Sequence, residues 1–534
     1  MKRYSLFLLF TISLFAKAQT PPKLLVGIVV DQMRYDYLER YKSKYGKGGF
    51  NRMIQQGYNF SRCNINYFPT FTGPGHAAIY SGTTPSINGI VANEWFERSI
   101  EDTMYCVSDS AVVGVGTNSS AGKMSPRNLL STTLSDELKL ATNFKGKVVG
   151  VCPKDRGSIL PSGHHPNACY WFEGKTGNWI TSSYYTKSLP AWVSDFNARK
   201  YPEQYLAGNW STLLPIAQYT ESSADNVPYE GLLSDKEKLP IFPHELPLIK
   251  KDGFGMLLQT PFGNSLTRKF AQEAIANEGL GQDNITDLLA VSFSSPDYIG
   301  HLYGINSIEI EDCYLRLDRE LDSFFNYLDK QVGKGNYLVF LTADHGAAHN
   351  PQFMNDSGIH AGSFDWKKAL DSLSANLEMH IKTKNLIRFY DNQQIYLDEQ
   401  VVKGKLINYN ELCDYISYFM TRFLGVDGCI TATQMRNAQL PDGPDAMMQR
   451  GYRPDRCGDV YIKLKPGWME LGRKTGTTHG SPFDYDTHIP FLLMGKGVKA
   501  GESGQSVSIT DIAPTICHIL KIQAPSGCTG KAVY

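Results

Sequence analysis

The sequence lacks an excess of charge of either sign. It contains 53 Lys and Arg residues against 53 Asp and Glu residues, so its formal net charge is zero. A balanced chain of this kind does not offer the generally basic surface that coats nucleic acid, and we expect no nucleic-acid partner. The chain also lacks internal repeats and low-complexity tracts, and its 42% hydrophobic and 20% charged residues are typical of a folded globular protein.

Long hydrophobic runs are also missing, apart from a short one at the N-terminus. Met1-Lys2-Arg3 precedes an apolar run that ends at Phe15, and Ala16-Lys17-Ala18 follows it. This order predicts a secretory signal peptide over residues 1–18, cut after Ala18. The run is too short for a membrane span and no other stretch is long enough. We therefore expect an exported protein, periplasmic or secreted, without a membrane span.

Paired cysteine motifs are absent as well. The chain has ten Cys residues, and none of them forms a CxxC pair. A thiolate zinc knuckle or a thioredoxin-like motif is therefore unsupported. In an exported chain several of these cysteines can form disulfides, but their number does not give the connectivity.

Apolar runs that alternate with helical patterns occupy most of the chain. An unbroken β-branched run such as Leu24–Val30 is typical of a strand buried on both faces of a parallel sheet. Similar runs recur at 147–152, 288–293, 337–342 and 490–494, with helical patterns between them. The alternation predicts an α/β fold, a three-layer sandwich with a mostly parallel central sheet. Ligands bind such sheets outside the carboxyl ends of the strands.

Two stretches interrupt this alternation. Residues 161–258 are rich in Tyr, Trp, Pro, Ser and Asn and show little periodicity. Residues 347–473 combine helical patterns at 365–381 and 408–423 with strand patterns at 394–397 and 459–464. We interpret both stretches as cap regions inserted into one catalytic domain that spans residues 19–534.

Three of the apolar runs are followed by an aspartate, namely Asp31, Asp297 and Asp344. At the carboxyl ends of neighbouring parallel strands, their side chains can converge. A single aspartate there would be explained by a turn or a helix cap. Three of them, two with His301 and His345 close by, indicate a binding centre.

The histidines near these aspartates have the spacing of metal ligands. Asp297 and His301 are four residues apart, so on a helix both face one ion. Asp344 and His345 are adjacent, and where a strand end curls into a loop both can face one ion or flank two. His479 lies in a Gly/Thr/Ser-rich loop and is a further candidate. Oxygen and nitrogen ligands without thiolates suit Zn²⁺, with Mn²⁺ or Fe also open. Any one of these histidines alone would be explained as a core or loop residue.

The stretch 68–80 places Thr70 and Thr72 just before a Gly-Pro-Gly turn and an expected helix. A helix start offers unpaired N–H groups and a positive dipole end to an anion. An ordinary helix cap is the simpler explanation of either hydroxyl. The residues alone do not choose between the two threonines.

Taken in order, these motifs resemble the alkaline phosphatase superfamily, and the resemblance spans nearly the whole mature chain. It is carried by Asp31, Thr72-Gly73-Pro74-Gly75-His76, Asp297-x-x-x-His301, Asp344-His345-Gly346 and Thr478-His479-Gly480. The resemblance implies two Zn²⁺ ions. It implies that one ion is held by Asp297, His301 and His479, and the other by Asp31, Asp344, His345 and the nucleophile, Thr72.

A finer resemblance is to the bacterial PafA-type phosphate-irrepressible alkaline phosphatases. It implies that Asn93, Lys154 and Arg156 bind phosphoryl oxygens; by themselves they would be a turn residue and two surface charges. A charge count supports this assignment, because three carboxylates and a Thr72 alkoxide balance two Zn²⁺ ions. A dianionic monoester then favours two further cations, whereas a monoanionic diester has less need of them.

Together these arguments predict an exported two-zinc alkaline phosphatase that hydrolyses small phosphate monoesters through a phospho-threonine on Thr72. One zinc would activate the hydroxyl and the other would stabilise the leaving oxygen. We expect a monomer. The nearest alternative is a nucleotide pyrophosphatase/phosphodiesterase of the same superfamily, against which Lys154 and Arg156 argue. A sulfatase is disfavoured because no Cys/Ser-x-Pro-x-Arg motif lies near Thr72. An exported binding protein with a structural metal site is a non-catalytic alternative.

Overall fold

The computed structural model describes residues 20–249 and 253–534. The predicted signal peptide, residues 1–18, lies outside this part of the chain. Among the helices of the described residues, none is both long enough and apolar enough to cross a membrane. The ten cysteines are all free thiols, and eight of them are buried.

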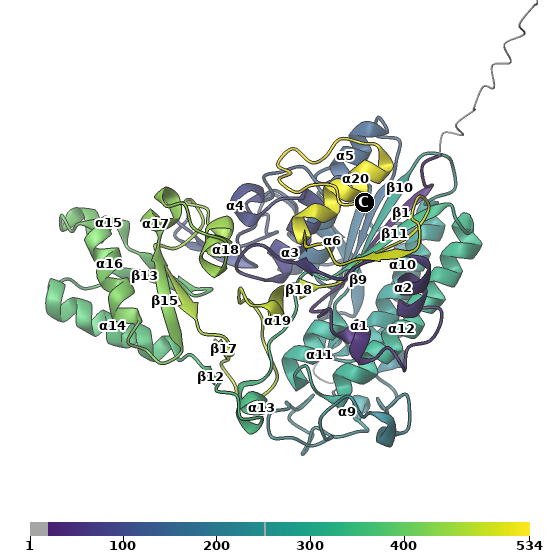
Figure 1. Ribbon diagram of the computed structural model, residues 1–534. Helices are drawn as coiled ribbons and strands as arrows, with labels where there is room; N and C mark the ends of the chain where they lie inside the picture. Colours follow the sequence, from purple (N-terminus) through teal and green to yellow (C-terminus); the bar gives the residue numbers. More distant parts are fainter. Residues whose placement is uncertain (1–19, 250–252) are drawn as a thin grey trace, which may run out of the picture.

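A ten-stranded sheet forms the centre of the molecule (Figure 1). Its middle strand β1 (Leu24–Val30) pairs in parallel with β10 (Asp287–Phe293) on one side and with β11 (Tyr337–Thr342) on the other. β7 (Val148–Val151) continues the parallel pairing beyond β10. From edge to edge, the order is β20 (Gly501–Ser503), β2 (Tyr58–Phe60), β19 (Phe491–Gly495), β11, β1, β10, β7, β8 (Ala168–Glu173), β9 (Asn178–Ser182) and β6 (Gly114–Val115).

The central strands are buried along their whole length, as their unbroken apolar runs predict. Every residue of β1, β10 and β11 is buried. A strand covered on both faces has no solvent side on which polar residues could alternate. Gly27 in β1 lies against Tyr80 and Phe340, where a Cβ would collide with both side chains.

Helices cover both faces of the sheet, which confirms the predicted three-layer sandwich (Figure 1). One layer holds α3 (Thr72–Ser81), α5 (Leu134–Ala141), α6 (Asp155–Ser162) and α20 (Ile512–Leu520). The other holds α2 (Phe50–Gln56), α10 (Phe262–Glu278) and α12 (Ile308–Leu328). α12 is amphipathic, and its buried side includes Leu317, Leu321 and Phe325.

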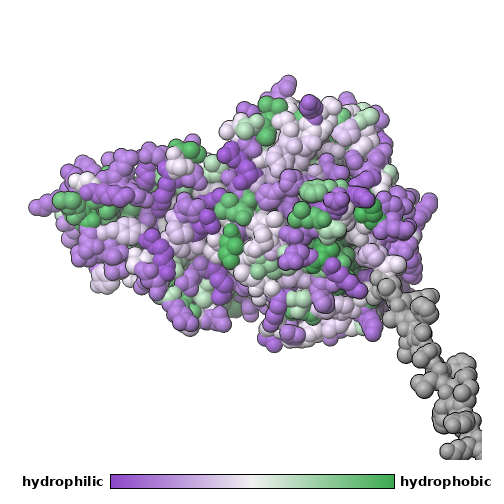
Figure 2. All heavy atoms as spheres, turned by 90° about the horizontal axis from the view of Figure 1, so that it is seen from above, coloured by the Kyte–Doolittle hydropathy of each residue, from purple (hydrophilic) through white to green (hydrophobic). Residues whose placement is uncertain are grey.

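Residues 364–470 form a smaller lobe, which projects from the main body as a narrower, largely hydrophilic extension (Figures 1 and 2). Its four-stranded sheet has the order β13 (Ile387–Asp391), β14 (Gln394–Leu397), β16 (Val460–Leu464), β15 (Val426–Thr431). α14 (Trp366–Ile381) and α16 (Tyr409–Met420) pack on this sheet around a separate hydrophobic core. These elements match the helical and strand patterns of the sequence.

The predicted insertion at 161–258 contains more regular structure than its sequence indicated. β8 and β9 lie within it and extend the main sheet beyond β7. Their aromatic residues, such as Trp171 and Trp179, are buried on the sheet. The division of the chain into a core with insertions at 161–258 and 347–473 stays a prediction.

Candidate active site and metal centre

Three aspartates converge at the carboxyl edge of the central strands. Asp31 follows β1 directly, and Asp344 lies two residues beyond β11. Asp297 lies in the first turn of α11 (Ser295–Tyr303), which begins just after β10. Because β10 and β11 flank β1 in parallel, all three carboxylates lie at one edge. They are 0%, 3% and 0% exposed for Asp31, Asp297 and Asp344, so each charge has left water and needs a partner.

Three histidines surround these carboxylates with the same ring nitrogen turned inward. His301 Nε2 lies 3.2 Å from Asp297 Oδ1, since α11 places both residues on one face. His345 Nε2 lies 3.5 Å from Asp31 Oδ1. His479 Nε2 lies 3.6 Å from Asp297 Oδ1. Nε2 of all three rings therefore faces the carboxylate cluster.

The opposite ring nitrogens fix the tautomers of these histidines. Nδ1 of each ring lies within hydrogen-bond distance of a backbone carbonyl oxygen, which only accepts, so Nδ1 carries the proton. The unprotonated Nε2 of each ring thus faces the centre, as in metal-binding histidines oriented by an outer hydrogen bond. The three bonds are His301 to Thr477 O at 2.9 Å, His345 to Gly346 O at 2.9 Å and His479 to Thr70 O at 2.8 Å.

The electrostatics of the cluster favour bound cations. Burial, Asp297 and Asp344 together raise the pKa of Asp31 well above its usual value. Asp31 Oδ1 accepts no hydrogen bond from any described residue, although it is fully buried. Burial lowers the pKa of His345 and of His479, which keeps both rings neutral. Crowded buried carboxylates beside neutral imidazoles are a donor set that fits divalent metal ions.

The donor atoms fall into two groups, each with its atoms within 4.8 Å of one another. One group is Asp31, Asp344 and His345, and the other is Asp297, His345 and His479. His301 adjoins the second group through its contact with Asp297. The arrangement resembles the two predicted ligand sets, with His345 between them. It has oxygen and nitrogen donors only, which suits Zn²⁺, Mn²⁺ or Fe.

Thr72 is the first residue of α3 and is almost completely buried. The residue in the cap position is Phe71, and the start of α3 has no side-chain cap hydrogen bond. Thr72 Oγ1 lies 3.5 Å from His345 Nε2, at the edge of the carboxylate cluster. The Thr70 hydroxyl instead donates to Ser481 O at 3.0 Å. The ordinary helix-cap interpretation therefore fails for both threonines, and only Thr72 directs its hydroxyl to the centre.

Asn93 and Lys154 lie beside the same centre. Asn93 Oδ1 accepts a hydrogen bond from Gly73 N at 2.7 Å, so the donor end of its amide is left for another partner. Lys154 Nζ contacts Asp31 Oδ2 at 2.7 Å and Asp297 Oδ2 at 2.5 Å. Against the effect of burial, these two carboxylates raise the pKa of Lys154, which stays protonated. Lys154 thus lies between the two ligand groups.

Arg156, in the first turn of α6, extends the positive side of the site. Its Nη1 donates to Tyr105 OH at 2.9 Å, and Tyr105 OH in turn donates to Asp155 Oδ1 at 2.5 Å. Arg156 Nε is buried and donates to none of the described residues. A partly buried guanidinium whose buried Nε–H is unused is suited to an anionic ligand.

Two residues that the sequence analysis left without a role also contact the centre. His76 Nδ1 lies 2.9 Å from Thr72 O, and the ring reaches Asp344 Oδ2 at 3.3 Å. Gln32 Nε2 donates to Asp297 Oδ1 at 2.7 Å. His76 could have been found from its spacing, because a residue four positions after Thr72 lies on the same face of a helix. Gln32 could have been found from its place directly after a strand-end aspartate.

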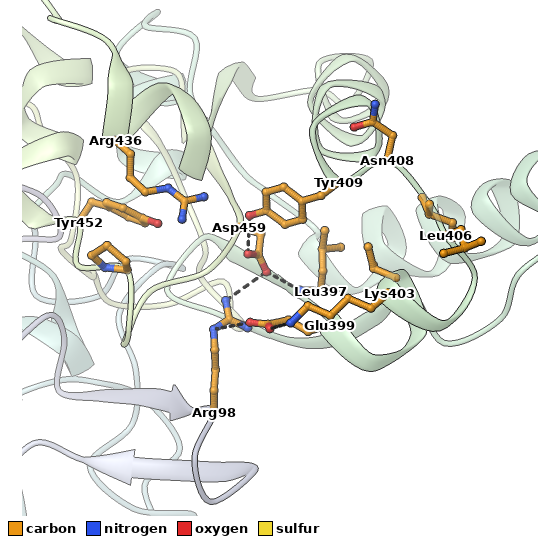
Figure 3. A pocket seen from close by; sticks show the side chains of 13 residues that line it. Arg98, Leu397, Glu399, Lys403, Leu406, Asn408, Tyr409, Arg436, Tyr452 and Asp459 are labelled. Carbon is orange, nitrogen blue, oxygen red and sulfur yellow. Dashed lines mark hydrogen bonds and ion pairs between the residues drawn. The ribbon is translucent and has the colours of Figure 1, made fainter.

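A cavity of about 660 Å³ lies in the smaller lobe, and none of the site residues described above lines it. Figure 3 shows the side chains that line it. Arg98, in the loop after β4 (Glu94–Glu97), reaches its wall, which the lobe otherwise supplies. Its central carboxylate, Asp459, accepts from Tyr409 OH at 2.7 Å, Leu397 N at 2.7 Å and Arg98 at 3.2 Å. Because these bonds satisfy Asp459, the cavity offers no reactive group comparable with the centre described above.

Comparison with known proteins gives concordant results. Residues 25–486 match the family described as type I phosphodiesterase / nucleotide pyrophosphatase. The chain is 49% identical to alkaline phosphatase PafA of Elizabethkingia meningoseptica over 516 residues, which cover 96% of this chain and 94% of that protein. It is 45% identical to alkaline phosphatase PhoV of Synechococcus elongatus, over 98% of this chain and 94% of that protein.

The fold comparison agrees with the sequence comparison. The crystal structure of wild-type alkaline phosphatase PafA superposes with a TM-score of 0.94 at 48% identity, covering 97% of this chain and 99% of that one. Such coverage leaves little of either chain unmatched. The chain therefore belongs to the type I phosphodiesterase / nucleotide pyrophosphatase family and, within the alkaline phosphatase superfamily, to the PafA-type alkaline phosphatases.

Proposed function

We propose that the protein is an exported, two-zinc alkaline phosphatase that hydrolyses small phosphate monoesters through a phospho-threonine on Thr72. Membership of the PafA-type alkaline phosphatases makes it a phosphomonoester hydrolase. The metal identity, the covalent intermediate and export after removal of residues 1–18 are the added parts of the proposal. A monomeric state is also part of it.

One observation carries the proposal, the orientation of His301, His345 and His479. Each donates Nδ1–H to a backbone carbonyl and presents Nε2 to buried carboxylates. Loop or core histidines would have no reason to share one inward-facing nitrogen. The ligands we assign are Asp297, His301 and His479 for one ion, and Asp31, Asp344, His345 and Thr72 for the other. When bound, the ions would supply Lewis acidity that lowers the pKa of a hydroxyl and stabilises charge on a leaving oxygen.

The chain's own residues would perform the transfer as follows. Thr72 Oγ1 attacks phosphorus as the P–O bond to the leaving group breaks, which gives a phospho-threonine and an alcohol. Gly73 N holds Asn93 Oδ1, so the Asn93 amide N–H₂ is free to donate to a phosphoryl oxygen. Lys154 and Arg156 neutralise the other oxygens. Water then cleaves the phospho-threonine, releases phosphate and restores the hydroxyl.

The preference for monoesters follows from the two cations. A monoester dianion has three non-bridging oxygens to be neutralised, and the buried Lys154 and the partly buried Arg156 supply two positive charges. A diester replaces one of these oxygens with an ester group, which would need apolar space and no cation. In this proposal Lys154 and Arg156 contact non-bridging oxygens, so a second ester group in place of one of these oxygens would displace a charged contact.

The decisive experiment compares p-nitrophenyl phosphate with bis-p-nitrophenyl phosphate. We expect kcat/KM for the monoester to exceed that for the diester, loss of both activities with a chelator, and recovery with Zn²⁺. A clear preference for the diester would instead support the nucleotide pyrophosphatase/phosphodiesterase alternative. Recovery with another metal but not with Zn²⁺ would refute the metal assignment while leaving the enzyme class intact.

A further inference from the structure

A second, smaller cavity opens directly beside the proposed catalytic centre. It has a volume of about 120 Å³, and its walls come from two parts of the chain. One side is formed by Phe71, Thr478 and His479 of the main body. The other side is formed by the turn of the β13–β14 hairpin and by residues 468–470, at the end of the smaller lobe. Water occupies about 30 Å³ in the liquid, so the space suits a group of a few heavy atoms.

The hairpin is fixed over the site by a contact with the residue that follows Asn93. Asn392 Nδ2 donates to Glu94 O at 2.9 Å. Asn392 and Gln393 both have positive φ, 52° and 60°, as a two-residue hairpin turn requires. The turn of the smaller lobe therefore forms one side of the cavity.

The cavity is acidic. Three of its lining residues are the carboxylates Asp391, Glu470 and Asp486, and none is Lys or Arg. Asp391 and Glu470 are half-buried parts of the smaller lobe, whereas Asp486 belongs to the main body. A phosphate group would be repelled from such a surface, so this cavity is not a second phosphate site.

Asp486 shows that the cavity has unused binding capacity. Its side chain is 1% exposed, and Oδ2 accepts from Ser481 N at 2.8 Å. Oδ1 is buried and accepts no hydrogen bond from the described residues. Burial raises the pKa of Asp486 to about 7. An acceptor that has lost water without gaining a donor is satisfied best by a ligand that donates hydrogen bonds.

The other two carboxylates accept hydrogen bonds from neutral groups. Asp391 accepts from Asn392 N and Nδ2, both at 2.9 Å, and Glu470 accepts from the Tyr390 hydroxyl. Burial and Glu94 raise the pKa of Asp391 to about 6. Burial and Asp391 raise the pKa of Glu470 to about 7, although the Tyr390 hydroxyl bonds to it. At alkaline pH, where an alkaline phosphatase acts, all three carboxylates are ionised and face one small space.

The position of the cavity assigns it to the leaving group. Asn93, Lys154 and Arg156 surround the transferred oxygens, and Thr72 attacks phosphorus. The remaining substituent is the ester group, which must extend away from Thr72. The cavity adjoins His479, a ligand of the group that does not include Thr72, and so lies where this substituent is expected.

We propose that this cavity is a leaving-group subsite that binds a primary ammonium, so that the enzyme favours aminoalkyl phosphate monoesters. The inference rests on the proposed function and deepens it. An ammonium supplies three N–H donors and one positive charge to Asp391, Glu470 and the free Oδ1 of Asp486. A leaving group that carries a carboxylate or a second phosphate would be disfavoured by the same charges.

The test compares two substrates of nearly the same shape, 2-aminoethyl phosphate and propyl phosphate, at about pH 9. The two leaving alcohols differ in intrinsic reactivity, so preferences are compared. The preference for the amine is kcat/KM for 2-aminoethyl phosphate divided by kcat/KM for propyl phosphate. The measured quantity is this preference in wild type divided by the preference in each variant. We expect Glu470→Gln and Asp391→Asn each to lower the preference for the amine about 5-fold, and the double variant about 20-fold. Propyl phosphate turnover should change less than about 2-fold.

The matched control is Asp414→Asn, an exposed position on α16 of the same lobe. It should leave the ratio unchanged. An unchanged ratio in the double variant, with propyl phosphate still hydrolysed, would overturn the subsite and leave the phosphatase proposal standing. Failure of wild type to hydrolyse propyl phosphate and p-nitrophenyl phosphate would instead overturn the proposed function itself.

Discussion

Replacement of Lys154 and Arg156 by alanine tests how substrate class is set. At about 4 Å and an effective dielectric constant of about 20, one pair of unit charges contributes about 4 kcal/mol. A monoester dianion carries one more negative charge than a diester monoanion, so each cation favours the monoester by up to this amount. Because water enters the vacated space, we take half of it, about 2 kcal/mol or roughly 30-fold in rate per cation.

The double variant should therefore lose about 10³-fold in its preference for p-nitrophenyl phosphate over bis-p-nitrophenyl phosphate. The assay is kcat/KM for both substrates in wild type, in both single variants and in the double variant. Lys154 also contacts Asp31 and Asp297. Metal content must therefore be measured in each variant, so that a lost ion is not mistaken for a lost substrate contact.

A matched control is Lys367→Ala, an exposed lysine on α14 of the smaller lobe. It should change neither rate, which excludes a general effect of net charge. Equal losses for monoester and diester in the double variant, with metals retained, would refute the electrostatic reasoning. The two cations would then contribute to catalysis without selecting the substrate.

Three further predictions follow from individual contacts. Thr72→Ala should lose at least about 10³-fold in kcat with its metals retained, whereas Thr70→Ala, which removes only a bond to Ser481 O, should cost about 1 kcal/mol of stability and little rate. Gly75→Ala would push α3 away from the Asp344 backbone and should cost about 1–3 kcal/mol together with activity. Gly404→Ala, with open space around it, is its control in thermal unfolding and turnover. Burial lowers the pKa of His244, but bonds to Glu237 and Glu309 raise it to about 9 from 6.5. A raised pKa stabilises the fold fully below pH 6.5 and progressively less up to pH 9. The fall in Tm across that range should thus be smaller in His244→Gln, and an equal fall in both proteins would contradict the assignment.

The candidate metal centre could be predicted from the sequence because its proposed ligands follow from regular structure. Asp31 and Asp344 come after continuous apolar runs, and only buried parallel strands have such runs. Once β1 lies between β10 and β11, the register places both carboxylates at one edge. The four-residue spacing of Asp297 and His301 needed only a helix, which α11 provides.

The proposed substrate contacts could not be predicted in the same way. Asn93 and Lys154 lie outside helices and strands, so no periodicity places them, and only the resemblance to a family selected them. The residues alone did not separate Thr72 from Thr70, and the resemblance selected Thr72. The structure adds that the Thr70 hydroxyl donates to the Ser481 carbonyl, 411 residues away in the chain. The acidic cavity likewise arises from the packing of a distant hairpin against the loop around Phe71.

The position of Lys154 links metal binding to substrate binding. Its ammonium contacts one carboxylate from each ligand group, Asp31 and Asp297. With cations held by those carboxylates, the ammonium would lose much of the negative charge that now stabilises it, while staying buried. A buried charge without a partner is costly, so Lys154 would then be stabilised by an anionic ligand whose oxygen accepts a hydrogen bond from its ammonium. Arg156 has an unused Nε donor whether or not cations are bound, so metal binding frees no further donor on it. The affinity for a phosphoryl dianion should consequently depend on metal loading through Lys154 far more than through Arg156.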